Sequence, residues 1–284
     1  MSLAFKNLPL PRRSQMKFTQ IIFDVTDKIA TITLNRPEAR NALAPQMRVE
    51  LAEAMDHIKK KAGEDIKAVI LTGAGGAFCA GGDVKSMGSR LNSASKARAA
   101  LRDDHQKMFD LMNLELPVIS LIDGAAAGAG ANIALAADFV LATPKGFLMQ
   151  AFVRIGLVPD WGGMYILPKL VGLQKAKELV FSGRRVYAEE AKEIGLIYDV
   201  VGADTAMQDA RDFASRFIDA PTQAIGLAKN IMNQSYSHDY KTILEMEAMA
   251  QSIARGADFH KEAITRFAEK KPALFDWESF DKRA

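Results

Sequence analysis

Short apolar runs, separated by polar turns, recur through roughly the first 200 residues of the chain. The runs Ile21–Val25 and Ile29–Leu34 flank a polar Thr-Asp-Lys connection, a pattern that predicts a β-hairpin. Similar runs follow at 67–73, 118–122, 139–142, 147–150 and 197–201. Because these runs are short and end at glycine, proline or polar residues, we expect them to form buried strands.

Segments with helical spacing lie between these strands and later replace them. Pro45 to Lys61 predicts a helix, because proline is tolerated in a first turn where its missing N–H would have had no partner. The other expected helices cover 86–100, 164–170, 173–181 and 188–194, and then 207–218, 222–233, 240–253 and 259–267. We therefore expect a loose arm over residues 1–16, an α/β core over 17–203 and a helical extension over 204–284, with two separate domains as the alternative.

Two glycine-rich loops each follow a predicted strand directly. The first, Gly73 to Lys85, contains an apolar Phe-Cys-Ala segment, which argues against a merely flexible surface connection. The second, Asp123 to Gly130, leads into an alanine-rich helix. Unpaired N–H groups and aligned peptide dipoles at a helix start favour negative charge. The second loop therefore predicts a site for a phosphate or an oxyanion.

Two chemistries use such a loop. The spacing Gly124-x-x-x-Gly128-x-Gly130 resembles the phosphate loop of short-chain dehydrogenases, but in that family the loop lies near the N-terminus, and here it lies in the middle of the chain. The other chemistry holds an enolate or tetrahedral oxyanion with two backbone N–H donors, and it requires a second loop. Since the chain has a second loop, we favour the oxyanion over the dinucleotide.

Composition narrows the possible function classes. The 284 residues are 49% hydrophobic and 25% charged, which suits a globular core, and no apolar run approaches the roughly 20 residues of a membrane span. A net charge of +3 is too mild for the basic surface that nucleic acid requires. Cys79 is the single cysteine, so a disulfide framework is excluded and a reducing, cytoplasmic location is expected. The four histidines show no ligand spacing, so no metal is expected.

Four motifs occur in the order and at the spacing of a known family. They are Asn35-Arg-Pro-x-x-Arg-Asn-Ala-Leu43, Phe78-Cys-Ala-Gly-Gly-Asp83, Asp123-Gly-x-x-x-Gly128-x-Gly130 and Gly156-Leu-Val-Pro-x-x-Gly-Gly163. On these motifs the chain, from about Phe18 to Trp277, resembles the crotonase superfamily, also called the enoyl-CoA hydratase/isomerase family. The resemblance implies a crotonase-like spiral of strand-strand-helix turns with a C-terminal helical trimerisation region. It also implies a homotrimer or a dimer of trimers.

The resemblance implies a substrate as well. Members of this family bind acyl-CoA thioesters and stabilise a thioester enolate, so coenzyme A is expected as part of the substrate and no separate cofactor is expected. The two oxyanion donors would be the backbone N–H groups of Gly82 and Ala129. The residues that would bind CoA are Arg40, Ala42, Ala80, Asp83, Val84 and Lys85.

The chain departs from the family's hydratases at the two positions where they carry a catalytic glutamate. Aligned through the glycines, these positions hold Asn132 and Phe152, and neither side chain exchanges protons. The remaining acid is Asp160, in a Pro-Asp-Trp-Gly-Gly turn where other members that isomerise double bonds carry an acidic residue. Its alternative role is to cap a helix that begins near Gly162.

Several functions therefore stay open. We favour a double-bond isomerase of fatty acid metabolism in which Asp160 moves the proton and Asn132 places a carbonyl or a water. A hydratase, hence a lyase, that uses Asp160 with water comes next, followed by a CoA-thioester hydrolase or dehalogenase with Asp160 as the nucleophile. A catalytically silent acyl-CoA-binding protein is the alternative outside the enzymes. Met87, Phe152 and Trp161 are expected to line an apolar acyl pocket.

Overall fold

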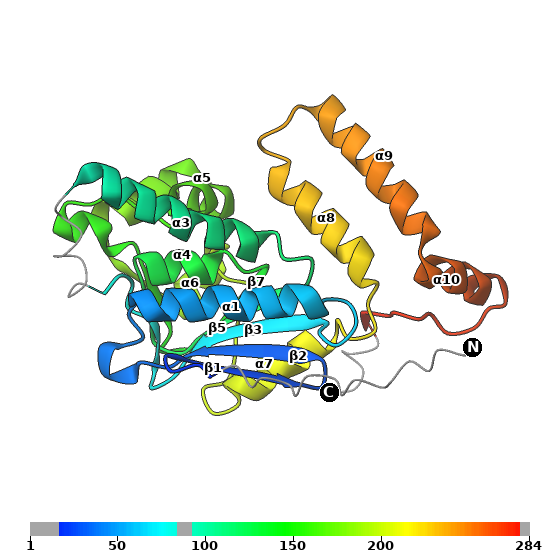
Figure 1. Cartoon of the computed structure of the whole chain (residues 1–284), viewed down its shortest axis with the longest axis horizontal. Helices are drawn as coiled ribbons and strands as arrows, with labels where there is room; N and C mark the ends of the chain where they lie inside the picture. The colour runs from blue at the N-terminus through cyan, green and yellow to red at the C-terminus, as the bar shows by residue number, and fades with distance from the viewer. Residues whose placement is uncertain (1–16, 84–92, 279–284) are drawn as a thin grey trace, which may run out of the picture.

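The computed structural model describes residues 17–83 and 93–278 (Figure 1). A six-stranded sheet has the order β1-β2-β3-β5-β7-β10, and only β1 runs antiparallel to its neighbour. Its strands are β1 (Ile21–Thr26), β2 (Ile29–Leu34), β3 (Ala68–Gly73), β5 (Val118–Ile122), β7 (Phe139–Ala142) and β10 (Asp199–Val200). The predicted hairpin and the predicted strands of this sheet are confirmed, although the last strand is shorter than expected.

A second sheet of four strands has the order β4-β6-β8-β9. Its strands are β4 (Ala77–Cys79), β6 (Ala125–Ala127), β8 (Phe147–Met149) and β9 (Arg185–Tyr187). Of these, only β8 was predicted. β4 and β6 lie within the two glycine-rich loops and pair in parallel, Ala77 with Ala125 and Cys79 with Ala126. This sheet therefore places the two loops side by side.

Helices cover both faces of the larger sheet. They are α1 (Pro45–Lys61), α3 (Ala94–Met112), α4 (Ala129–Leu135), α5 (Gly163–Ser182), α6 (Ala188–Glu193), α7 (Ala206–Ser215), α8 (Thr222–Gln234), α9 (Tyr240–Gly256) and α10 (Asp258–Ala268), with short 3-10 helices η1 (Pro37–Ala39) and η3 (Ala151–Ile155). Gly172 interrupts α5 with a non-helical φ of +75° and ψ of 160°, as the two separately predicted segments require. The helix predicted over 86–100 instead covers 94–112, and residues 84–92 lie outside the described part of the chain.

The core has two layers because successive residues of a strand point to opposite faces of the sheet. Val69 and Leu71 of β3 join the buried cluster on the α1 side, whereas Ala68 and Ile70 join the cluster on the α7 side. Figure 1 shows α1 and α7 on opposite sides of the sheet. α7 thus completes the core, although the sequence assigned it to the helical extension.

The helices α8, α9 and α10 extend away from the sheets (Figure 1). α8 is fixed to the core by Lys229, whose buried ammonium lies 2.7 Å from Asp138 Oδ2 and donates to Leu116 O at 3.0 Å. α9 and α10 have no buried residues, and their apolar side chains, such as Leu244 and Phe267, are exposed. The predicted trimer or hexamer would cover such a surface, and it stays a prediction. In the described residues, no helix combines the length and apolar character that crossing a bilayer demands.

Asn41 joins the loop before α1 to the first glycine-rich loop. It is fully buried, with a left-handed φ of +57°. Its Nδ2 donates to Ala74 O at 2.8 Å and to Ala77 O at 2.7 Å, and its Oδ1 accepts from Arg36 N at 2.8 Å. One amide side chain thereby satisfies three backbone groups of two loops.

Asn41→Gly should lower the free energy of unfolding by about 2 to 3 kcal/mol, because it leaves buried backbone groups without partners. Asn41→Ala should cost about 1 kcal/mol more, since alanine resists the left-handed conformation that glycine adopts freely. Urea denaturation measures both values. Asn35→Ala is the control, because no side-chain hydrogen bond involves Asn35 among the described residues. An Asn41→Gly protein as stable as wild type would contradict the assignment.

Candidate active site

The two glycine-rich loops approach each other so closely that side chains do not fit between them. A Cβ on Gly81, whose φ is +94°, would lie 2.8 Å from Ala127 O and 3.5 Å from Ala129 N. A Cβ on Gly130 would lie 2.4 Å from Cys79 O. Contacts below about 3 Å are not tolerated, so glycine is required at both positions. The first loop therefore lies directly against the start of α4.

Each of the two loops has one backbone N–H group that points away from the hydrogen bonds of the neighbouring helix or strand. Ala129 is the first residue of α4, and N–H groups of a first helical turn have no partner within the helix. In the first loop, Leu43 N donates to Gly81 O at 2.8 Å. The described peptide bonds are trans, so the N–H of Gly82, in the same peptide as that carbonyl, points to the side opposite Leu43.

Four of the six residues expected to bind CoA are described, and they lie in two segments that contact each other. Ala80 N donates to Arg40 O at 2.9 Å, and Arg40 itself is exposed with a φ of +49°. Arg36 Nη1 donates to Ala42 O at 2.8 Å and forms an ion pair with Asp83 Oδ2 at 3.2 Å. The Asp83 carboxylate thus braces its own loop. Val84, Lys85 and Met87 lie outside the described residues.

Asn132 holds the segment that carries Asp160. It is fully buried in α4, its Nδ2 donates to Asp160 O at 2.7 Å, and its Oδ1 accepts from Gln150 Nε2 at 2.8 Å. A Cβ on Gly163 would lie 2.3 Å from Asn132 Nδ2, so α5 begins directly against this amide. Both ends of the Asn132 amide are occupied within the protein, which gives the side chain a structural task. Gln150 was not identified from the sequence.

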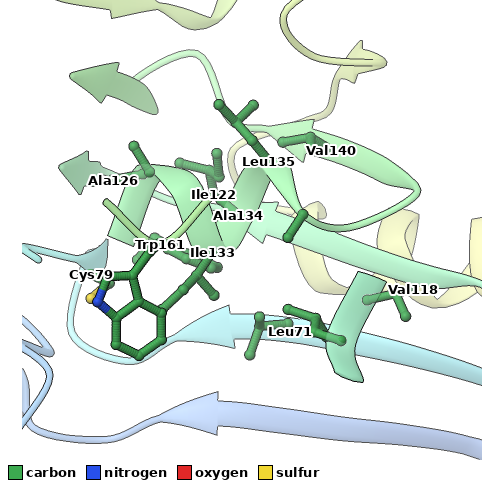
Figure 2. Close-up of a cluster of buried hydrophobic side chains, with 14 of the residues drawn as sticks. Leu71, Cys79, Val118, Ile122, Ala126, Ile133, Ala134, Leu135, Val140 and Trp161 are labelled. Atoms are coloured by element: carbon green, nitrogen blue, oxygen red, sulfur yellow. The ribbon is translucent and has the colours of Figure 1, made fainter. Parts of the chain in front are cut away.

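Asp160 begins a tight turn with unusual backbone angles. Gly163 N donates to Asp160 O at 3.0 Å, and the two residues between them, Trp161 and Gly162, have φ of +48° and +77°. A left-handed conformation is unfavourable for a residue as large as tryptophan. The indole of Trp161 is 4% exposed and packs in the buried cluster that includes Cys79 and Ile133 (Figure 2). Burial of the ring compensates for the backbone conformation.

The Asp160 carboxylate is not a helix cap. The N-cap residue of α5 is Gly162, and in the described part of the chain no hydrogen bond joins the Asp160 carboxylate to the first turn of α5. Oδ1 of Asp160 is buried and has no hydrogen-bond partner among the described residues. Burial raises the pKa of Asp160 to about 6, Asp104 adds to the rise, and His105 and Arg48 oppose it. A carboxyl with this pKa can take up a proton near neutral pH.

A cavity of about 450 Å³ adjoins Asp160. Its described lining is mostly apolar and consists of His105, Met108, Phe109, Met112, Asn113, Pro159, Asp160, Gly162, Met164, Tyr165, Asn233 and Gln234. The α3 members at 105, 108, 109 and 112 follow the i, i+3, i+4, i+7 spacing of one helix face. That signal was present in the sequence but was missed, because the predicted helix ended at residue 100.

The rim amides of this cavity are satisfied by the protein. Asn233 Nδ2 donates to Met112 O at 2.7 Å, and Asn113 Nδ2 donates to Phe109 O at 2.8 Å. The cavity therefore suits an apolar group. The two other residues predicted for an acyl pocket are not part of this lining, and their role stays a prediction. Trp161 is in the core, and the Phe152 ring lies 3.7 Å from a Cβ built on Gly128, beside the start of α4.

Tyr165 and Lys169 match the Tyr-x-x-x-Lys spacing that short-chain dehydrogenases use. The match is not supported by their surroundings. Tyr165 Oη donates to Asn233 O at 3.0 Å, and Lys169 Nζ lies 3.4 Å from the centre of the Tyr165 ring, on its face. The strand order of the larger sheet follows the chain without a reversal, so the sheet lacks the switch point at which a dinucleotide fold binds its ligand.

Comparison with known proteins gives consistent matches over nearly the whole chain. A sequence model of the enoyl-CoA hydratase/isomerase family matches residues 24–279. A protein of Rhodobacter capsulatus named probable enoyl-CoA hydratase is 36% identical over 262 residues, which cover 92% of this chain and 99% of that protein. The 1,2-epoxyphenylacetyl-CoA isomerase of Escherichia coli is 33% identical, with 90% and 97% covered. A crystal structure of an enoyl-CoA hydratase/isomerase from Cupriavidus metallidurans matches with a TM-score of 0.87 at 33% identity, with 92% and 97% covered.

The raised pKa of Asp160 predicts a stability cost at neutral pH. The pKa of the native carboxyl is about 6 and the ordinary pKa of an aspartate is 3.8, so between these values the native state binds more protons and stability falls as pH rises. Asp160→Asn should therefore be more stable than wild type by roughly 1 to 3 kcal/mol at pH 8, and the difference should disappear below about pH 4. Denaturation at several pH values measures this, with the exposed Asp204→Asn as the charge control. A destabilised Asp160→Asn protein at pH 8 would contradict the prediction.

Proposed function

Since the chain belongs to the enoyl-CoA hydratase/isomerase family, with its crotonase fold and acyl-CoA chemistry, we propose that it shifts a carbon–carbon double bond in an acyl-CoA thioester. The observation that carries the proposal is the Asp160 carboxylate. It has a buried oxygen without a partner among the described residues, it lies on the wall of an apolar cavity, and its pKa is raised by burial. These are the properties of a base that acts on a weakly acidic carbon.

The two loop amides supply the complementary part of the reaction. The N–H groups of Gly82 and Ala129 would donate to the thioester oxygen as negative charge develops on it. Each such donor is worth roughly 3 to 4 kcal/mol in a transition state. The contact between Gly81 and Ala129 N supports this arrangement, because it brings the two loops within reach of one oxygen.

The proposed steps balance without any oxidant or reductant. The Asp160 carboxylate removes a proton from the α carbon of a 3-enoyl thioester. The electron pair of the broken C–H bond moves through the carbonyl to give a dienolate, whose oxygen the two amides hold. The Asp160 carboxyl then returns the proton at the far end of the former double bond, and a 2-enoyl thioester results.

The surroundings of Asp160 favour isomerisation over hydration. Hydration in this family relies on two glutamates, whose positions here hold Asn132 and Phe152. The Asn132 amide is occupied by Asp160 O and Gln150, and Phe152 is apolar and packs beside the Gly128 backbone. Asp160 is the one carboxylate in the described lining of the cavity. A single carboxyl suffices for a proton shift, whereas hydration adds a water that must be placed and activated.

The names of the relatives represent both reactions. The Escherichia coli relative is named an isomerase and the Rhodobacter capsulatus relative a probable hydratase. Hydration with Asp160 and water is therefore the second candidate. It predicts a different product from the same substrates.

Incubation in deuterated water distinguishes the two reactions. From a 3-enoyl-CoA we expect a 2-enoyl-CoA without the mass gain of one water, which carries deuterium only to the extent that the Asp160 carboxyl exchanges its proton with solvent before returning it. From crotonyl-CoA we expect no hydrated product. Asp160→Asn should lower kcat on the 3-enoyl ester by about 10²- to 10⁴-fold, because it removes the base. Mass spectrometry and rate measurements provide the readout, with Asp204→Asn as the control. Hydrated crotonyl-CoA as the main product, or full activity of Asp160→Asn, would refute the proposal.

Gly81→Ala tests the oxyanion donors. The new methyl group would push the first loop away from Ala127 and Ala129, so kcat should fall by roughly 10²- to 10³-fold while KM changes little. Gly63→Ala is the matched control, since Gly63 also has a positive φ, of +83°, but its Cβ would make only ordinary contacts at 3.8 Å and beyond. Equal effects of the two substitutions on kcat would show that the strained backbone, and not the loop contact, is responsible.

A further inference from the structure

Arg48 of α1 contacts three separate parts of the candidate site. The residue is 8% exposed. Its Nη1 lies 2.6 Å from Asp104 Oδ2 in α3, and its Nη2 donates to Leu43 O at 3.1 Å. Its guanidinium carbon lies 5.7 Å from the centre of the Trp161 ring. The sequence suggested no role for this arginine.

We propose that Arg48 is a positioning residue. It fixes three parts of the site relative to one another: the first glycine-rich loop, the helix α3 that lines the cavity, and the turn that carries Asp160. The inference rests on the proposed function, because it assigns a task within the same reaction. Arg48 is not part of the described lining of the 450 Å³ cavity beside Asp160, so it acts through the groups it contacts, of which Asp104, Leu43 and Trp161 are described here.

Through Leu43, Arg48 is connected to the first glycine-rich loop. Leu43 N donates to Gly81 O, and Leu43 pairs with Gly82 in an isolated parallel bridge. Leu43 O accepts from Arg48 at the same time. Arg48 therefore holds the backbone segment against which the Gly82 amide is set.

The contact with Asp104 reaches the cavity. Asp104 is 3% exposed and precedes His105, the first member of the α3 face that lines the cavity. Lys107 Nζ also lies 3.8 Å from Asp104 Oδ1. The ion pair between Arg48 and Asp104 joins α1 to α3, and it thereby sets the distance of the apolar α3 face from Asp160.

Through Trp161, Arg48 is connected to the turn that contains Asp160, the proposed base. Trp161 follows Asp160 directly and has the unfavourable φ of +48°. A guanidinium on the face of the indole adds a cation–π attraction to its burial. Arg48, Met108 and Trp161 also border one small cavity of about 30 Å³, so the three side chains share one packing site.

A contribution to stability does not by itself explain the buried ion pair between Arg48 and Asp104. Replacing such a pair by apolar side chains of similar volume is often neutral or stabilising, whereas removing one partner is strongly destabilising. The planar fork of arginine holds a carboxylate, a carbonyl and an aromatic face in fixed directions, which an apolar pair would not do. Geometry is therefore the property to test.

The test compares Arg48→Met, Asp104→Leu and the double variant Arg48→Met/Asp104→Leu. The single variants should lose stability because each leaves a buried charge, and the double variant should recover it. Yet kcat of the double variant should stay about 10- to 100-fold below wild type with KM within a few-fold, since small displacements of reacting groups cost rates of this size. A double variant with wild-type kcat would overturn the proposal.

Lys229→Met is the matched control, because Lys229 forms a buried ion pair with Asp138 at 2.7 Å and does not line the cavity. It should lose stability but keep kcat at temperatures where the protein is folded. If kcat fell as much as in the double variant, loss of stability would explain both results and the positioning role would be wrong.

The pH dependence of kcat/KM gives a second readout. The charged groups that act on Asp160 are His105 and Asp104 of α3 and Arg48 of α1. Arg48 lowers the pKa of Asp160 and Asp104 raises it, so the acid limb should move to higher pH in Arg48→Met and to lower pH in Asp104→Asn. Lys229→Met should leave the limb in place. Shifts of both variants in the same direction would contradict the inferred arrangement.

A spectroscopic readout separates this inference from the proposed function. The chain has two tryptophans, so Trp277→Phe leaves Trp161 as the only tryptophan, whose emission can be excited selectively over that of the tyrosines. In that background, acrylamide should quench Trp161 more readily after the double substitution than after Lys229→Met. If wild type failed to isomerise any enoyl-CoA, the proposed function would fail while this measurement still reported on the turn. Unchanged quenching in the double variant would overturn the positioning role.

Discussion

The close approach of two backbone segments is the constraint on which the rest of the site depends. β4 and β6 pair in parallel within the two glycine-rich loops, and this pairing brings Gly81 against Ala129. Glycine is required where the loops touch, since any side chain would meet a backbone oxygen. In the larger sheet, β3 and β5 are parallel neighbours and therefore end at the same edge. Both loops start from that edge. The geometry of the amides is thus decided by main-chain packing.

The segment of Asp160 is positioned by different means. Its turn contains an unfavourable tryptophan conformation, which persists because the indole is buried in the core (Figure 2) and because Asn132 holds the carbonyl of Asp160. α4 therefore serves both halves of the site. Its first residue, Ala129, carries the proposed oxyanion donor, and its fourth residue, Asn132, fixes the turn that contains Asp160, the proposed base. A shift of α4 would move both groups together.

The sequence predicted the larger sheet, the boundaries of α1 and the two loops, because these features follow from apolar runs and glycine spacing. It predicted β8 from the apolar run Phe147–Met149, but not β4 or β6, whose three residues lie within glycine-rich loops, nor β9, which begins with an arginine. Trp161 was assigned to the acyl pocket on its apolar character alone, whereas the positive φ of its turn directs it into the core. Asn132 was considered for catalysis because residue type shows capacity for hydrogen bonds but not which partners occupy them.

Oδ1 of Asp160, which has no hydrogen-bond partner in the described part of the chain, links stability to the proposed reactivity. A capping hydrogen bond from the start of α5 would have stabilised the carboxylate and lowered its pKa, and the turn geometry avoids it by placing Gly162 at the cap. Without that hydrogen bond the folded protein is less stable, and for the same reason the carboxylate keeps its raised pKa and an available lone pair. Because Asn132 binds the main chain of the turn rather than this side chain, the same turn is rigid in its backbone and unsatisfied at its reactive atom. That combination is what the proposed proton shift at carbon would require of Asp160 as its base.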